Sequence, residues 1–196
     1  MQIGVLALQG AFAEHVAMLR RLGVTPKEVR LPCDMEGLDG LIMPGGESTV
    51  MGKLATAFKL IDPIRNFAYA RKPIWGTCAG LIFMARDVGH VQPLLDLLYV
   101  KVERNAFGRQ VDSFIADLPI PIVNKALGLV DTPFRAMFIR APIVKSVGQG
   151  VDILAQLPDG KIVAVQQEHL LGTSFHPELT QDGRMHQYFL NLVENS

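Results

Sequence analysis

The sequence predicts an α/β protein built on a doubly wound, mostly parallel sheet with helices on both faces. Short apolar runs alternate along the chain with segments of helical periodicity. Runs without polar alternation are typical of parallel strands, which are buried on both faces. The 18 glycines and 12 prolines supply many tight connections. A chain of 196 residues is expected to form one domain over residues 1–196.

The composition excludes several classes of protein. With 19 basic and 19 acidic residues, the chain carries no net charge, which argues against nucleic acid or an anionic membrane as the main partner. We find no signal-peptide pattern and no apolar run as long as a membrane span. Two cysteines are too few for a disulfide scaffold, and a reactive thiol requires a reducing compartment, so we expect a cytoplasmic protein.

The first elements follow the alternating pattern closely. Ile3–Leu8 is a continuous apolar run and predicts a strand, and Ala11–Leu22 has helical spacing and ends at Gly23. Lys27–Leu31 and Gly40–Met43 predict the second and third strands. The sheet therefore begins with three strands and an intervening helix.

A glycine-rich loop, Pro44 to Thr49, directly follows the third predicted strand. Its two glycines permit unusual backbone conformations and close approach of a ligand, although an ordinary tight turn would use them equally well. We expect Ser48 or Thr49 to cap a helix that begins near Val50. Active sites of open α/β sheets lie at the carboxyl ends of strands, where this loop falls.

The pattern Gly-x-Cys-x-Gly around Cys78 predicts a nucleophile elbow, because an apolar strand precedes it and a helical run follows. Side chains at Gly76 or Gly80 would collide with the strand or the helix in such a turn. At a helix N-terminus the dipole favours the thiolate, and the Ala79 N–H is free to point at an oxyanion. The alternative is a buried structural cysteine on an ordinary strand-to-helix turn.

The second half is less regular. Arg104, Arg109 and Arg140 fall in loops or at strand ends, where they are either surface charges or groups that grip a substrate carboxylate. Asp117–Pro133 contains three prolines and predicts an irregular, mobile segment. The remaining predictions are strands at Leu97–Val102, Gln110–Ala116 and Phe134–Ile139, a hairpin of Val151–Gln156 with Lys161–Gln166, and a final helix at Gln181–Val193.

The triplet His176-Pro177-Glu178 predicts a catalytic base with its orienting partner. A residue before proline is driven out of the helical region, and side chains two apart in an extended chain share one side. Glu178 would then hold one imidazole nitrogen of His176 and leave the other for the thiol. The remaining histidines have no comparable spacing and are interpreted as structural or surface residues: His15, His90, His169 and His186.

Together, Gly-Thr-Cys-Ala-Gly and Ser-Phe-His-Pro-Glu resemble the motifs of class I (triad) glutamine amidotransferases. Further segments are similar to the family of glutaminase subunits of pyridoxal 5'-phosphate synthase, and the resemblance spans nearly the whole chain. These segments are Gly4–Gly10, Pro44–Thr49, Val102–Asn105, Phe107–Phe114, Phe138–Pro142 and Phe175–Thr180.

The resemblance implies hydrolysis of L-glutamine to L-glutamate and ammonia, and it implies a role for each matching residue. Cys78 matches the nucleophile, His176 the general base and acid, and Glu178 the residue that orients His176. Gly46 and Ala79 match the backbone donors of the oxyanion hole. The positions that match glutamine-binding residues are Gly45, Gly46, Glu47, Ser48, Arg104, Ile139 and Arg140.

The resemblance also implies a fold and a partner. The expected fold is a flavodoxin-like three-layer sandwich of the class I amidotransferase type. The expected partner is a separate synthase subunit, which uses the ammonia to build pyridoxal 5'-phosphate from a pentose phosphate and a triose phosphate. Members of the family are poorly active until they dock on that subunit, and they need no metal or organic cofactor.

Three alternative functions remain. A glutaminase subunit of another pathway, such as histidine biosynthesis, is disfavoured by the segment Phe107–Phe114. Many cysteine peptidases and stress proteins of related fold place histidine directly after the cysteine, where this chain has Ala79. A catalytically silent binding module is disfavoured by the intact set of Cys78, His176 and Glu178.

Overall fold

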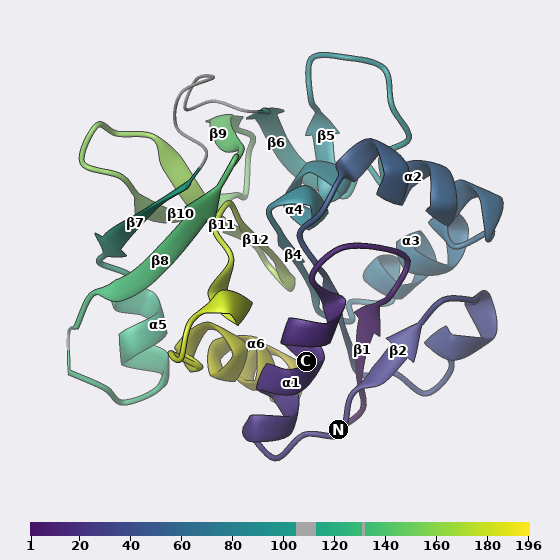
Figure 1. Ribbon diagram of the computed structural model, residues 1–196, viewed down its shortest axis with the longest axis horizontal. Coiled ribbons are helices and arrows are strands. Elements are labelled where there is room, and N and C mark those ends of the chain that lie inside the picture. Colours follow the sequence, from purple (N-terminus) through teal and green to yellow (C-terminus); the bar gives the residue numbers. More distant parts are fainter. Residues whose placement is uncertain (105–112, 131) are drawn as a thin grey trace.

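The computed structural model describes residues 1–104, 113–130 and 132–196 (Figure 1). The strands are β1 Ile3–Leu6, β2 Lys27–Val29, β3 Gly40–Met43, β4 Ile74–Thr77, β5 Ala85–Asp87, β6 Leu98–Glu103, β7 Ser113–Leu118, β8 Phe134–Ile139, β9 Ile143–Val147, β10 Asp152–Gln156, β11 Ile162–Gln167 and β12 Leu170–Thr173. The helices are α1 Phe12–Arg21, α2 Ser48–Ala57, α3 Ile61–Tyr69, α4 Ala79–Met84, α5 Pro121–Ala126 and α6 Arg184–Glu194, with short 3₁₀ helices η1 Pro32–Met35 and η2 Pro177–Leu179.

The main sheet has the strand order β2-β1-β3-β4-β12-β11-β9-β6-β5, and β10 pairs with β11. The strands from β2 to β12 in this order pair parallel, which confirms the predicted α/β class. An antiparallel extension through β11 and β9 continues the sheet, and β7 and β8 form a separate antiparallel pair. The parallel part brings the carboxyl ends of β1, β3, β4 and β12 to one edge, where active sites of this architecture lie.

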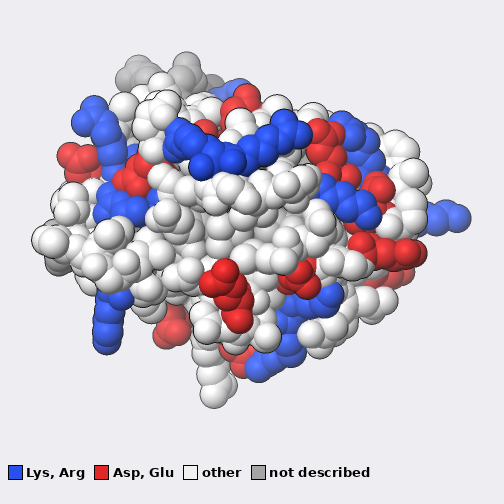
Figure 2. Space-filling view, turned by 90° about the horizontal axis from the view of Figure 1, so that it is seen from below, with Lys and Arg blue, Asp and Glu red and all other residues white. Residues whose placement is uncertain are grey.

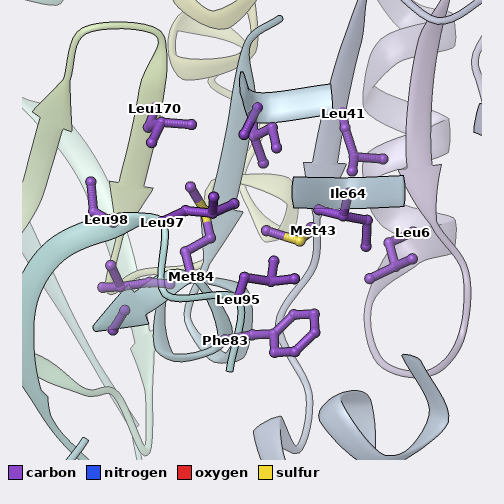
Figure 3. Close-up of a cluster of buried hydrophobic side chains, with 14 of the residues drawn as sticks. Leu6, Leu41, Met43, Ile64, Phe83, Met84, Leu95, Leu97, Leu98 and Leu170 are labelled. Atoms are coloured by element: carbon purple, nitrogen blue, oxygen red, sulfur yellow. The ribbon is translucent and has the colours of Figure 1, made fainter. Parts of the chain in front are cut away.

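Alternation along the central strands divides the core into two clusters, one on each face of the sheet. In β3, Leu41 and Met43 belong to one cluster and Ile42 to the other. In β4, Ile74 and Trp75 separate in the same way, as the two-residue period of a strand requires. Figure 3 shows the first cluster, which also contains Leu6 and Phe83.

The helices cover both faces of the sheet and give the predicted three layers (Figure 1). Apolar residues of α2, α3 and α4 pack in the first cluster. Those of α1, α5 and α6 pack in the second cluster together with side chains of β8. The amphipathic stripe predicted for the first helix is confirmed, because Val16 and Leu19 are buried.

The prediction of an irregular, mobile segment at Asp117–Pro133 is wrong for part of that segment. Pro121–Ala126 forms α5, where the proline occupies the first turn and so costs no helical hydrogen bond. Ile120 and Val123 are buried in the second cluster, and packing rather than periodicity holds this six-residue helix. Residues 105–112 and 131, which include Arg109 and the start of a predicted strand, lie outside the described residues.

The surface matches the balanced composition. Figure 2 shows a face on which basic and acidic groups are intermixed and separated by uncharged areas. In the part of the chain that the structure describes, every helix is too short or too polar to cross a membrane.

Candidate active site

Cys78 lies on the predicted strand–turn–helix elbow. Strand β4 ends at Thr77, Cys78 has φ +47° and ψ −101°, and α4 begins at Ala79. A non-glycine residue with positive φ is strained, so its surroundings must hold it in place. The Cys78 N–H donates to the Thr173 carbonyl over 2.8 Å, and the Cys78 carbonyl accepts from the Ile82 N–H over 3.2 Å. These bonds on both sides of the side chain fix its direction.

The two glycines of the elbow are required by backbone contacts. A Cβ on Gly76 would lie 2.5 Å from the Gly80 carbonyl carbon. A Cβ on Gly80 would lie 2.1 Å from the Met43 carbonyl oxygen at the end of β3. Both contacts are far too short for real atoms, which confirms the predicted collisions with helix and strand.

The Gly45–Gly46 turn is packed tightly between the loop that follows β1 and His176. A Cβ on Gly45 would lie 2.3 Å from His176 Cε1, so only glycine fits there. The Ala11 N–H donates to the Gly45 carbonyl over 3.1 Å. Gly46 has φ +150°, and a Cβ there would meet Gln9 Oε1 at 2.2 Å. Glycine at both positions thus allows the turn to pack against the His176 imidazole and Gln9. An ordinary tight turn without these neighbours would not need two glycines.

The prediction that Ser48 or Thr49 caps α2 is wrong, because Glu47 occupies the N-cap position. Its carboxylate accepts from the Thr49 N–H over 3.1 Å and from the Val50 N–H over 2.8 Å. Ser48 is the first helical residue and is buried. Burial opposes the charge of Glu47, but these two backbone donors and the nearby Arg104 lower the pKa of its carboxyl group.

His176 and Glu178 are in contact as predicted, although the backbone route differs from the prediction. His176 Nδ1 and Glu178 Oε1 are 2.7 Å apart, and both side chains are almost fully buried. Pro177–Leu179 forms the 3₁₀ helix η2 rather than an extended chain. His176 alone keeps a non-helical conformation, with φ −107° and ψ 85°, as a residue before proline must. Because His176 lies just outside the 3₁₀ helix and Glu178 lies inside it, their side chains meet here, as they would in an extended strand.

The charges around His176 favour its protonated form. Burial lowers its pKa, but hydrogen bonds with Cys78 and Glu178 outweigh burial and raise the pKa to about 10. The imidazole is therefore an imidazolium at neutral pH. Burial raises the pKa of Glu178, but His15 and His176 together outweigh burial and lower it. Because burial keeps His15 itself uncharged, with a pKa lowered to about 3, the effective cause at neutral pH is the hydrogen bond with the charged His176.

One cavity of about 400 Å³ brings most of the predicted site residues together. Its lining consists of Gly46, Glu47, Ser48, Cys78, Ile82, Arg104, Ile139, Arg140 and His176. Ile82, one turn along α4 from the cysteine, was not predicted. The remaining predicted residues adjoin the lining: Gly45 and Glu178 contact His176, and Ala79 follows Cys78 in the chain. Within the described residues, His, Cys, Asp and Glu form no group that suits a metal ion.

Arg104 is held at the cavity by four polar partners. Its Nη2 donates to Glu47 Oε1 over 2.9 Å, and its Nη1 lies 3.1 Å from His90 Nε2. The same Nη1 donates to Thr49 Oγ1 over 3.2 Å and to Gln92 Oε1 over 3.4 Å. A carboxylate and a guanidinium, the two groups that recognise an amino acid backbone, are thus paired at one wall of the cavity.

Two further residues lie near the site: Gln9, to which the sequence analysis gave no role, and His15, which it interpreted as a structural or surface residue. Gln9 Oε1 accepts from the Glu47 N–H over 2.9 Å and so supports the glycine turn. His15 is fully buried, and its Nε2 lies 3.3 Å from Glu178 Oε2. His15 falls one residue before Val16 and four before Leu19, on the buried face of α1. That helical spacing indicated burial, but it did not indicate which residue His15 contacts.

A cysteine on an elbow at the edge of a parallel sheet, with an imidazolium and a buried carboxylate beside it, defines an α/β protein equipped for thiol-nucleophile chemistry. Sequence comparison specifies the family. The chain belongs to the SNO glutamine amidotransferase family, which matches residues 5–195.

Individual relatives agree with this assignment over their full length. A protein of Herpetosiphon aurantiacus named pyridoxal 5'-phosphate synthase subunit PdxT is 52% identical, and the match covers 98% of this chain and 100% of that protein. The protein of the same name from Moorella thermoacetica is 50% identical, with the same coverage. A crystal structure described as a glutamine amidotransferase superposes with a TM-score of 0.90 at 47% identity, covering 98% of each chain.

Proposed function

We propose that this chain, as one glutaminase domain over residues 1–196, hydrolyses L-glutamine to L-glutamate and ammonia. The ammonia passes to a pyridoxal 5'-phosphate synthase subunit, which is the hetero-oligomeric partner in vitamin B6 biosynthesis. Family membership and the names of the full-length relatives support this proposal. The observation that carries it is the meeting of Cys78 and His176 in one cavity with Glu178 directly behind. We propose a cytoplasmic location, because a reactive thiol in this role requires a reducing compartment.

Attack on glutamine starts from the imidazolium form of His176, which holds the proton taken from Cys78. The thiolate adds to the side-chain carboxamide carbon, and the carbonyl oxygen becomes an oxyanion. The backbone N–H groups of Gly46 and Ala79 are the proposed oxyanion donors. Each such donor is worth about 3–4 kcal/mol of transition-state stabilisation.

Collapse of the tetrahedral intermediate releases ammonia. His176 gives its proton to the departing nitrogen, and a thioester forms on Cys78. The imidazole is then neutral and takes a proton from the water that hydrolyses the thioester. This proton transfer contributes a factor of about 10²–10⁴ to the rate. Glu178 holds the imidazole ring in the required orientation during both steps.

The polar wall of the cavity suits the amino acid end of the substrate. Arg104 and Arg140 carry the charge that a substrate carboxylate needs, and Glu47 carries the charge that an ammonium group needs. Ser48 and Ile139, with the Gly45–Gly46 backbone, complete the proposed glutamine site. In the free protein, Glu47 and Arg104 pair with each other, so substrate has to compete with this ion pair.

We attribute low activity without the partner to the glycine turn. The Gly45–Gly46 backbone has to present an N–H to the oxyanion, and glycines allow that turn to change conformation when the synthase subunit docks. The measurement is ammonia release from glutamine with and without that subunit. Equal rates in the two conditions would exclude this role of the turn.

The nucleophile is tested by replacing Cys78 with alanine. Alanine keeps the Cβ and the backbone strain, so Cys78→Ala should fold with a melting temperature close to that of the wild type. Its ammonia release in the presence of the synthase subunit should fall by a factor on the order of 10⁶, below detection. The matched control is Cys33→Ala, which removes the exposed cysteine and should leave the rate unchanged. Ammonia release by Cys78→Ala at the wild-type rate would refute the assignment.

A further inference from the structure

The second oxygen of Glu178 points away from His176 into the protein interior. Glu178 Oε1 is used by His176, whereas Oε2 lies 3.3 Å from His15 Nε2. The side chains of His15 and Glu178 have no exposed surface. The 3.3 Å contact with His15 Nε2 does not have the geometry of a hydrogen bond, so Oε2 has no hydrogen-bond partner among the residues that the structure describes. A buried charged oxygen without a donor is costly, so the His15 contact needs an explanation.

His15 is itself held by two buried polar groups. Its Nδ1 lies 2.9 Å from His186 Nε2, and its Nε2 lies 3.2 Å from Thr77 Oγ1. The Trp75 ring packs edge-on against both imidazoles, with centroid distances of 5.8 Å to His15 and 4.9 Å to His186. Four elements meet here, namely α1, β4, η2 and α6, and together they leave the His15 ring little freedom to rotate.

These contacts decide which nitrogen of His15 carries the proton. If Nδ1 carried it, the lone pair of Nε2 would face the carboxylate of Glu178, and two acceptors would repel each other. With the proton on Nε2, His15 donates toward Glu178, and its Nδ1 accepts from the Nε2–H of His186. This second arrangement gives each short contact one donor and one acceptor.

We propose that His15 is a positioning residue for the triad, which donates from Nε2 to Glu178 Oε2 while His186 fixes its tautomer. The donor anchors the inner oxygen of the carboxylate, so that the outer oxygen stays aimed at His176 Nδ1. His15 touches neither substrate nor the reacting sulfur, and it acts through Glu178 alone. The effect on turnover rests on the proposed glutaminase function, whereas the effect on His176 does not.

A neutral donor suits this position better than a cation would. The charged and titratable groups around His15 are Glu178, His186 and, further away, His176. Burial dominates over the attraction of Glu178 and lowers the pKa of His15 to about 3. A neutral imidazole orients the carboxylate without cancelling its charge, which remains available to the His176 imidazolium.

The test compares two amides of different reach at position 15. In His15→Gln the side-chain nitrogen takes the place of Nε2 and keeps the donor to Glu178. In His15→Asn the amide takes the place of Nδ1, so its oxygen can still accept from His186, but no donor reaches Glu178. For His15→Asn we expect kcat for ammonia release, measured with the synthase subunit, to fall about 10–100-fold with little change in KM. His15→Gln should recover most of this loss.

The second measurement needs neither glutamine nor the synthase. In a Cys33→Ala background, the rate of alkylation of Cys78 by iodoacetamide is followed against pH. Without the donor, the carboxylate of Glu178 can turn away from His176 Nδ1, which lowers the pKa of the His176 imidazolium. The alkaline limb of the profile should therefore shift to lower pH by about 0.5–1 unit in His15→Asn. In His15→Gln this limb should stay near the wild-type position. Urea unfolding of each variant shows whether it is folded, and His15→Leu replaces His15→Asn if the latter is not.

His169→Gln serves as the matched control, because this histidine is partly buried and contacts the Ala68 carbonyl away from the cavity. It should change neither kcat nor the alkylation profile. A folded His15→Asn with wild-type kcat and an unmoved profile would overturn the proposal. So would equal losses in the Asn and Gln variants with an unmoved profile, which would indicate a purely structural role. If the wild type released no ammonia, the proposed function would fail, while the alkylation profile would still decide the role of His15.

Discussion

The backbone of Cys78 is a strained point of the site. Holding a non-glycine residue at positive φ costs about 1–3 kcal/mol, and neighbouring contacts have to offset this cost. Here the Thr173 carbonyl and the Ile82 N–H hold the two peptide groups of Cys78. The glycines at 76 and 80 let the turn approach its neighbours closely enough to make these bonds. The position of the sulfur thus depends on two residues that have no side chain.

Replacing Gly80 with alanine tests this dependence. The new Cβ would lie 2.1 Å from the Met43 carbonyl, which is backbone and cannot swing aside, so β3 and α4 have to separate. We expect Gly80→Ala to lower the free energy of unfolding by about 3 kcal/mol or more, and to abolish glutaminase activity. Urea titration and ammonia release measure the two effects.

Gly128→Ala separates strain from collision. Gly128 has φ +63° with nothing within 4 Å of its Cβ position, so alanine meets only the cost of positive φ, about 1 kcal/mol. This variant should keep full activity. If Gly80→Ala were no more destabilising than Gly128→Ala, close packing would not be what demands glycine in the elbow.

The helix α2 begins at a residue that also lines the cavity of the proposed site. Ser and Thr are preferred caps, which is why the sequence predicted Ser48 or Thr49. The longer side chain of Glu47 instead folds back to two backbone N–H groups of the first turn. The same carboxylate pairs with Arg104 across the cavity. One side chain therefore fixes both the start of α2 and the polar wall of the site.

The charge of Glu47 should therefore contribute to stability in a pH-dependent way. Its pKa is lowered on folding, so its contribution is present above the unfolded value of about 4.5 and disappears as the pH falls through the folded value. Glu47→Gln should be less stable than the wild type at pH 7 by about 0.5–1 kcal/mol, and the gap should close toward pH 3. Urea unfolding at several pH values tests this. The exposed Glu36→Gln serves as control and should show no gap at either pH.

Sequence alone predicted the elements whose signals are local. β3 and β8 have the predicted ends, and the elbow and the His176–Glu178 contact were predicted from short motifs. The helix α5 was missed because six residues show no period, and its stability comes from burial of Val123.

Long-range contacts had no such signal. The strand β12 pairs with β4, which precedes it by almost half the chain, and this pairing places Thr173 beside Cys78. The contact of His15 with Glu178 depends on how α1 packs against η2. Neither spacing nor composition contains that information, so only the structure could reveal it.

On the scale of the whole molecule, the site exists because four parallel strands end at one edge of the sheet. Gln9, Gly45, Cys78 and His176 follow β1, β3, β4 and β12 respectively. Each strand contributes one short loop, and the two core clusters hold the strands in register from both faces. The polar chain from His176 through Glu178 and His15 to His186 then runs from the cavity into the second cluster.

This buried chain makes the stability of the whole fold sensitive to acid. Burial lowers the pKa values of His15 and His186 to about 3, whereas an unfolded histidine titrates near 6.5. Between these two pH values the unfolded chain binds protons that the folded chain does not bind, so the free energy of unfolding falls as the pH falls. Each histidine contributes a slope of up to about 1.4 kcal/mol per pH unit in this window.

Replacing His186 with glutamine should remove one of these two contributions. At pH 7, His186→Gln should be less stable than the wild type, because its contacts with His15 and Trp75 are altered. As the pH falls from 6.5 to 4, the wild type loses stability faster, and the gap should narrow by up to about 1.4 kcal/mol per pH unit. Phe189→Leu, a buried change on the same helix without a titrating group, is the control, and its gap should stay constant with pH. If the stability difference between His186→Gln and the wild type were equally constant with pH, the pKa of His186 would not be lowered in the folded protein.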